Sequence, residues 1–248
     1  MTKNNNKAKN LKAFKEFLSD NKFTIIFSAL VVVFLGGMIW LSNIQKIDLS
    51  NIDVSKEIPA SENSGKITEH IYHKSDAKVT LVEYGDFQCP GCKTADSRIK
   101  AIAEEYKGRV NVIFRNFPLV SIHPNALAGA SVAEAAGLQG KYWEMHELLY
   151  DKQDEWSAAS AKERMDYFTE YANELKLNID QFKKDIESEK IKAKIKFDQS
   201  VGSKAKVTGT PSFAINGKEV TSDVWGNDSR FKAALDEAIR NQNNHNYK

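Results

Sequence analysis

The sequence has 248 residues, 42% hydrophobic and 27% charged, which is ordinary for a globular protein and excludes disorder throughout the chain. Its only two cysteines, Cys89 and Cys92, are too few for a disulfide-rich scaffold or a zinc site closed by four thiolates. The formal net charge is +2, yet residues 1–22 carry six lysines and two acids, which leaves −2 for the rest. Because the basic charge belongs to this short tail, nucleic-acid binding by the body has little electrostatic support.

Residues 23–41 (FTIIFSALVVVFLGGMIWL) contain no charge. A helix of 19 residues, at about 1.5 Å per residue, nearly matches a hydrocarbon core about 30 Å thick. A core helix usually keeps a polar face, and a cleaved signal peptide ends in small residues, whereas this run ends in Trp40 and Leu41. Six lysines crowd before the run and only Lys46 and then Lys56 follow it closely, so we predict a single uncleaved transmembrane anchor, with the N-terminus in the cytoplasm and the body outside.

Residues 42–65 are polar and end in Pro, Ser, Asn and Gly, without a sustained helical or strand period. They predict a flexible tether with a reach of roughly 25 to 30 Å. The body, residues 66–248, would therefore stay close to the membrane and remain mobile.

The body begins with a β-α-β pattern. Residues 79–84 are apolar and β-branched, as in a buried strand, and a Cys-Pro-Gly-Cys segment follows at 89–92. Ile99, Ile102 and Tyr106 then share one face of a helix, and residues 110–114 (VNVIF) predict the second strand. Because a helix connects the two strands, we expect them to be parallel.

Residues 123–206 change in composition to Ala, Glu, Lys, Leu and Met, which favours helices. The expected helices cover 124–137, 141–152, 161–176 and 180–200. Strand character returns at 212–215, and the Asn-Gly pair that follows predicts a hairpin into residues 218–221. A helix over 229–241 closes the chain. We therefore predict an α/β domain with a helical block between its second and third strands.

The two cysteines lie one turn apart at the expected strand-to-helix junction. A sulfur at a helix start lies near unpaired backbone N–H groups, which favour its thiolate, and Pro90 suits the first helical position. We assign Cys89 as nucleophile and Cys92 as resolving thiol in disulfide exchange, which requires neither metal nor organic cofactor. The alternatives are a structural disulfide, half of a metal site and chance spacing.

Glu83 interrupts the apolar strand six residues before Cys89. A buried carboxylate is costly, and burial raises its pKa toward neutrality, which would suit Glu83 to move the proton of Cys92. The alternative is a solvated position at the edge of the strand.

Several segments together resemble the exported DsbA-like thiol:disulfide oxidoreductases of the thioredoxin superfamily, in their membrane-anchored form. These are residues 83–92 (EYGDFQCPGC), 115–119 (RNFPL), 123–126 (HPNA), 139–146 (QGKYWEMH) and 209–213 (GTPSF). The resemblance covers residues 67–240 and implies a thioredoxin-like fold with a helical insertion.

The resemblance also implies roles for single residues. Cys89 would be the exposed nucleophile, Cys92 its partner and Glu83 the buried acid. Pro211, which alone would be expected to be trans, would be a cis-proline facing the disulfide, and the backbone of Thr210 would bind an extended substrate segment. Phe87, Pro90 and Gly91 complete the motif around the cysteines.

One departure from the family pattern concerns Gly91, since strongly oxidising members often have a histidine there. Without a side chain at this position we expect a less stabilised reduced form and weaker oxidising power. His123 lies beyond the second strand, where a loop or helix-capping role is favoured over tuning of the cysteines.

Our leading hypothesis is a membrane-tethered oxidase that introduces disulfides into exported, reduced proteins. The resemblance implies reoxidation by a quinone-linked membrane partner of the DsbB or VKOR-like type. One alternative is an isomerase or reductase kept reduced by a membrane electron donor. The other is a metal-binding or chaperone module that holds a soft ion with Cys89, Cys92 and His123.

Overall fold

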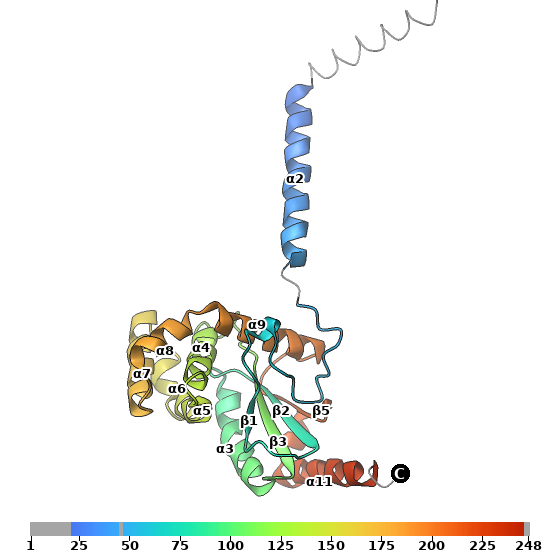
Figure 1. Cartoon of the computed structure of the whole chain (residues 1–248), viewed down its shortest axis with the longest axis vertical. Helices are drawn as coiled ribbons and strands as arrows, with labels where there is room; N and C mark the ends of the chain where they lie inside the picture. The colour runs from blue at the N-terminus through green and yellow to red at the C-terminus, as the bar shows by residue number, and fades with distance from the viewer. Residues whose placement is uncertain (1–20, 45–46, 246–248) are drawn as a thin grey trace, which may run out of the picture. The chain divides into compact units, whose positions relative to one another are not determined.

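The computed structural model describes residues 21–44 and 47–245. The chain divides into two compact units, Met1–Asp48 and Leu49–Lys248, which are described separately. In the first unit the structure contains the helix α2 (Lys22–Ile44), over the apolar run predicted from the sequence (Figure 1). Among the described residues, none of the helices combines the length and the hydropathy that a membrane span requires. The predicted helix is thus observed, whereas its predicted role as a transmembrane span is not supported.

The second unit is built on a five-stranded sheet with the order β1-β3-β2-β4-β5. Its strands are β1 (His70–Tyr72), β2 (Val79–Gly85), β3 (Val110–Asn116), β4 (Ser212–Ile215) and β5 (Lys218–Val220). The pair β2 and β3 is parallel and joined by α3 (Pro90–Glu105), as predicted, and the remaining pairs are antiparallel. Every residue of β2 and β3 is buried, because both strands are central and covered on both faces.

A helical insertion separates β3 from β4, as the composition predicts. It contains α4 (Ala126–Gly137), α5 (Tyr142–Asp151), α6 (Gln153–Trp156), α7 (Ala161–Glu174), α8 (Ile179–Ile186) and α9 (Glu189–Lys204). Helices α4 to α8 gather on one side of the sheet, and α9 leads back to the strands (Figure 1). The single helix expected over 180–200 is two helices, because the chain turns at Glu187 and Ser188 becomes the N-cap of α9. After β5 come α10 (Ser222–Trp225) and α11 (Asp228–His245).

Two apolar clusters hold the unit together. One lies between α3, α11 and the sheet, and contains Ile102 and Phe231 among others. The other joins the insertion to the sheet and includes Trp156, Phe114 and both cysteines. The cysteines therefore lie at the boundary between the sheet and the inserted helices.

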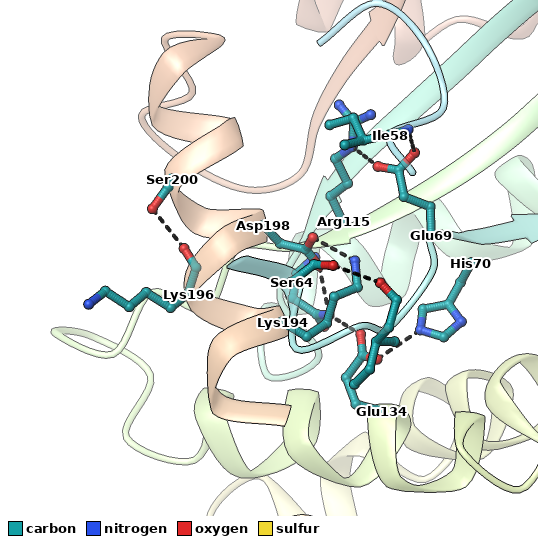
Figure 2. Close-up of polar contacts among 12 residues, drawn as sticks. Ile58, Ser64, Glu69, His70, Arg115, Glu134, Lys194, Lys196, Asp198 and Ser200 are labelled. Atoms are coloured by element: carbon teal, nitrogen blue, oxygen red, sulfur yellow. Dashed lines mark hydrogen bonds and ion pairs between the residues drawn. The ribbon is translucent and has the colours of Figure 1, made fainter. Parts of the chain in front are cut away.

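Residues 49–65 differ from the free tether that the sequence predicts, because they belong to the second unit and are held there by hydrogen bonds. The buried Arg115 donates to the carbonyl oxygens of Val54 and Lys56, at 3.0 and 2.8 Å, and pairs with the Glu69 carboxylate. Glu69 in turn accepts from the backbone N–H of Ile58 at 2.7 Å (Figure 2). Since these partners lie far apart in the sequence and use backbone atoms, no local pattern indicates the contact.

Candidate active site

The loop after β2 places the first cysteine at the start of a helix. Cys89 is the N-cap of α3, with extended backbone angles (φ −73°, ψ 122°), and Pro90 occupies the first helical position, as predicted. The backbone N–H of Cys89 donates to the Asp86 carbonyl at 3.0 Å, which closes the loop. The Cys89 sulfur consequently lies beside the free N–H groups of the first turn.

The two thiols have opposite electrostatic environments. The pKa of Cys89 is lowered from 9.0 to about 5, chiefly by a hydrogen bond from the Cys92 thiol and further by the backbone N–H groups of Cys92 and Gly91. Burial raises the pKa of Cys92 well above 9.0. Cys89 is itself only 8% exposed, so the expected exposed nucleophile is accessible only relative to Cys92, which is fully buried. A stable thiolate thus stands beside a thiol that keeps its proton.

We predict that the reduced protein titrates one thiolate near pH 5. The absorbance of thiolate at 240 nm, followed between pH 3 and 9, should show this step in the wild type and lose it in Cys89→Ser. Because the folded pKa lies below the unfolded value of 9.0, this thiolate stabilises the reduced fold fully above pH 9. That stability is lost as the pH falls through about 5. A step near pH 9 instead would contradict the prediction.

The segment before β4 faces the cysteines. The Thr210–Pro211 peptide bond is cis, as the resemblance implies. The Cys89 sulfur lies 3.4 Å from the Thr210 carbonyl oxygen. A Cβ atom added to Gly91 would lie 3.1 Å from Cδ of Pro211 and 3.6 Å from the Cys89 sulfur. The structure therefore brings Thr210, Pro211, Gly91 and Cys89 together around one point.

Glu83 lies in the middle of the sheet and not on a solvated edge. It pairs with Phe114 of β3 on one side and Phe213 of β4 on the other, and is only 3% exposed. Within the described part of the chain its Oε1 has no hydrogen-bond partner. Burial, followed by the nearby charges of Asp96 and Cys89, raises its pKa from 4.5 to about 8. Glu83 is therefore an acid that exchanges its proton near neutral pH.

Sequence reasoning missed Gln153, which supports the cysteine loop from the insertion. Its Nε2 donates to the carbonyl oxygens of Phe87 and Cys89, at 2.7 and 3.1 Å, in a buried setting. Phe87 is itself a core residue, with its ring against Phe114 and Tyr150. No sequence signal identifies Gln153, because it lies 64 residues beyond Cys89 on a helix of only four residues.

Gln153→Leu should lower the free energy of unfolding by about 1 to 3 kcal/mol, because it leaves buried carbonyl groups without a donor. It should also raise the pKa of Cys89, since the first turn of α3 is held less firmly. Chemical denaturation and the thiolate absorbance measure the two effects. The matched control is Gln139→Leu, whose amide donates to Asn178 away from the cysteines. Equal behaviour of both variants would refute a positioning role for Gln153.

His123 contacts the loop and not the cysteines. Its Nδ1 lies 2.8 Å from an Asp86 carboxylate oxygen, and the same oxygen accepts from the backbone N–H of Leu119. This is the loop role that the sequence favours. In the described residues, no group of three or more His, Cys, Asp or Glu side chains is placed to hold a metal ion.

The arrangement supports thiol–disulfide exchange. In the reduced state Cys89 is a nucleophilic thiolate, and Cys92 carries the proton that it must lose before it attacks. In a mixed disulfide between Cys89 and a second thiol, the same environment makes Cys89 a good leaving group.

Comparison with known proteins places these features in a known group. A sequence model of the thioredoxin family matches residues 65–237. The "Probable disulfide bond formation protein D" of Bacillus anthracis is 31% identical over 228 residues, which cover 87% of this chain and 94% of the relative. The Na(+)/H(+) antiporter NhaA 3 of Salinispora tropica is 35% identical over 150 residues, 60% of this chain but only 22% of that protein.

Among solved structures, BdbD from Bacillus subtilis in its oxidised form has a TM-score of 0.61 at 22% identity, covering 74% of this chain and 97% of the other. At that identity the similarity shows the fold alone.

Proposed function

We propose that this chain, which belongs to the thioredoxin family and within it to the DsbA-like thiol:disulfide oxidoreductases, acts outside the cytoplasm as an oxidase. It would introduce disulfides into exported proteins whose cysteines are reduced. The observation that carries the proposal is the contrast between the Cys89 thiolate and the buried Cys92 thiol. A stabilised thiolate favours the reduced state of the pair and so makes its disulfide a stronger oxidant.

The size of this effect follows from the pKa. A Cys89 pKa of about 5 lies two units below pH 7, so ionisation stabilises the reduced pair at pH 7 by at most about 2.7 kcal/mol. This stabilisation raises the reduction potential of the two-electron couple by roughly 60 mV. The backbone N–H groups and Cys92 supply it without a side chain at Gly91. We therefore propose an oxidising pair despite the missing histidine.

The reaction balances without a cofactor. A substrate thiolate attacks the Cys89 sulfur, the Cys89–Cys92 bond breaks, and Cys92 leaves and takes up a proton. A second substrate thiolate then attacks the substrate sulfur of the mixed disulfide and expels the Cys89 thiolate. Two electrons pass to the pair, and the substrate gains one disulfide.

The test is oxidation of a reduced, unfolded protein by the oxidised full-length chain in detergent, together with the redox state of the pair in cells. Oxidase function predicts substrate disulfides and a mostly oxidised pair after rapid alkylation. A mostly reduced pair in cells would instead favour the isomerase or reductase alternative and refute the oxidase.

We further propose that residues 23–41 anchor the protein in the membrane. The uncharged run, the six lysines before it and the helical state of α2 support this. Side chains on α2 such as Phe27, Val32 and Val33 are about two-thirds exposed or more, and such apolar surface is costly in water. Reoxidation would come from a quinone-linked membrane partner of the DsbB or VKOR-like type. Release of the full-length chain from membranes by alkaline carbonate would contradict the anchor.

A further inference from the structure

The connection between α2 and the second unit is much shorter than the tether of residues 42–65 that the sequence predicts. Because residues 49–65 belong to the second unit, only residues 45–48 remain after the end of α2 at Ile44. Ile44 and Leu49 are five positions apart in the chain, so their Cα atoms lie at most about 18 Å apart in any conformation. The surface around Leu49 is therefore the part of the second unit that the connection keeps nearest to the proposed anchor.

The C-terminal end of α9 fixes Leu49 on the second unit. Nζ of Lys204 donates to the carbonyl oxygens of Leu49 and Ile52, at 2.6 Å each. Lys204 is the last residue of α9 and is exposed. The contacts of Arg115 with the backbone of residues 54 and 56 hold the chain that follows. The connection to α2 thus begins beside the outer surface of α9.

This outer surface carries lysines whose charge is not neutralised within the protein. Lys196 and Lys206 are exposed, and among the described residues no carboxylate lies within ion-pair distance of either. Figure 2 shows the Lys196 side chain directed away from the buried pair of Lys194 and Asp198 on the same helix. Lys192, one turn before Lys196 on the same face, contacts only the 90% exposed side chain of Glu189, and such an ion pair is weak in water.

The neighbouring segment 49–65 does not supply the missing counterions. Each of its acidic side chains already pairs with a lysine: Asp53 with Lys56 at 3.4 Å, Glu57 with Lys74 at 2.6 Å, and Glu62 with Lys66 at 2.9 Å. The lysines of α9 and of the turn after it are therefore free to meet an external anion.

We infer that the outer surface of α9, formed by Lys192, Lys196 and Lys206, binds the anionic headgroups of the membrane that holds the anchor. The inference rests on the proposed function, since the short connection confines this surface to the membrane only if residues 23–41 span it. Each lysine near an anionic bilayer favours the bound orientation by about fivefold. Electrostatic attraction reaches about 10 Å at 0.1 M salt, which is comparable with the length of the connection.

Binding of this surface would orient the second unit on the membrane. Thr210, which lies against the Cys89 sulfur, is only four positions beyond Lys206 in the chain. Four residues span at most about 14 Å, so the cysteines would lie close to the lipid surface. They would then be within reach of a reoxidising partner embedded in the same membrane.

The test measures the acylation of single lysines in the full-length chain, reconstituted into phosphatidylcholine vesicles with or without phosphatidylglycerol as the anionic lipid. A membrane-impermeant reagent is used, and mass spectrometry gives the rate at each lysine. We expect Lys192, Lys196 and Lys206 to react about fivefold more slowly in the anionic vesicles. The exposed Lys107, which follows α3, should react equally in both. Salt at about 0.5 M should abolish the difference, because it screens the attraction.

A charge-reversed variant shows whether the lysine charges cause the protection. Lys196→Glu combined with Lys206→Glu should return the acylation rate of Lys192 in anionic vesicles to its value in neutral ones. The matched control combines Lys107→Glu with Lys162→Glu, two exposed lysines on other parts of the unit, and should keep Lys192 protected.

The outcomes separate this inference from the anchor. Equal acylation in both kinds of vesicle, in a chain that resists alkaline carbonate, would overturn the inference and leave the anchor intact. Protection of Lys192 that persists in the charge-reversed variant would overturn it as well. Release of the chain by carbonate would overturn the anchor and the inference with it. None of these results touches the oxidase proposal, which depends on net substrate oxidation by the Cys89–Cys92 pair.

Discussion

Cys89→Ser should abolish oxidation of a reduced substrate, with a loss of about 10³-fold or more, because no other described sulfur can begin the exchange. Cys92→Ser should behave differently. Its Cys89 can still attack a disulfide but has no partner to resolve the product, so mixed disulfides with substrates should accumulate. Both variants are assayed with the full-length chain, by oxidation of an unfolded substrate and by non-reducing gels.

The difference between the two serine variants identifies which cysteine is the nucleophile. Cys89 has the lowered pKa and the helix N-cap position, whereas Cys92 is fully buried, so only Cys89 should form adducts with an added alkylating agent near pH 6. Substrate adducts on Cys92 in the Cys89→Ser protein would reverse the assignment. Residual oxidase activity in both serine variants would mean that the Cys89–Cys92 pair is not the reacting group.

The local features of the site were predictable from the sequence because they depend on neighbouring residues. The strand of 79–84, the turn through Cys89 and the helix start at Pro90 are all local, and the structure contains each of them. The hairpin around Asn216 and Gly217 follows from the same kind of signal. Such local patterns predict the folded structure correctly because the backbone preference and the burial pattern favour the same structure.

The supporting contacts were not predictable, because each joins residues far apart in the chain. Gln153 reaches the loop from the insertion, and Arg115 holds residues 54 and 56 through backbone oxygens that carry no side-chain signal. The burial of His146 is also not predictable, although its segment carries part of the resemblance, because the packing of α5 decides it. Only the packing of α5 against α3 brings it near Asp96.

Glu83→Gln should slow the attack of Cys92 on a mixed disulfide by about 10²-fold while making the protein more stable at neutral pH. The loss of rate arises because an amide cannot take the proton of Cys92. The gain of stability arises because a carboxyl with a pKa near 8 in the fold ionises at about 4.5 when unfolded. Between these values the folded state binds more protons, so wild-type stability falls as the pH rises from 4.5 to 8, and no further above 8.

The free energy of unfolding of the wild type should therefore fall by about 3 kcal/mol between pH 4.5 and 7 through this one group. Glu83→Gln should not show this fall. Denaturation of the oxidised proteins at pH 5 and pH 8 measures it, because the cysteines then do not titrate. Asp185→Asn, at another buried carboxyl, serves as the control. Equal pH dependence in wild type and Glu83→Gln would show that Glu83 ionises freely, and the same result would remove its role as the base for Cys92. A slower but more stable variant would mean that the fold retains a costly buried acid because proton transfer at Cys92 requires it.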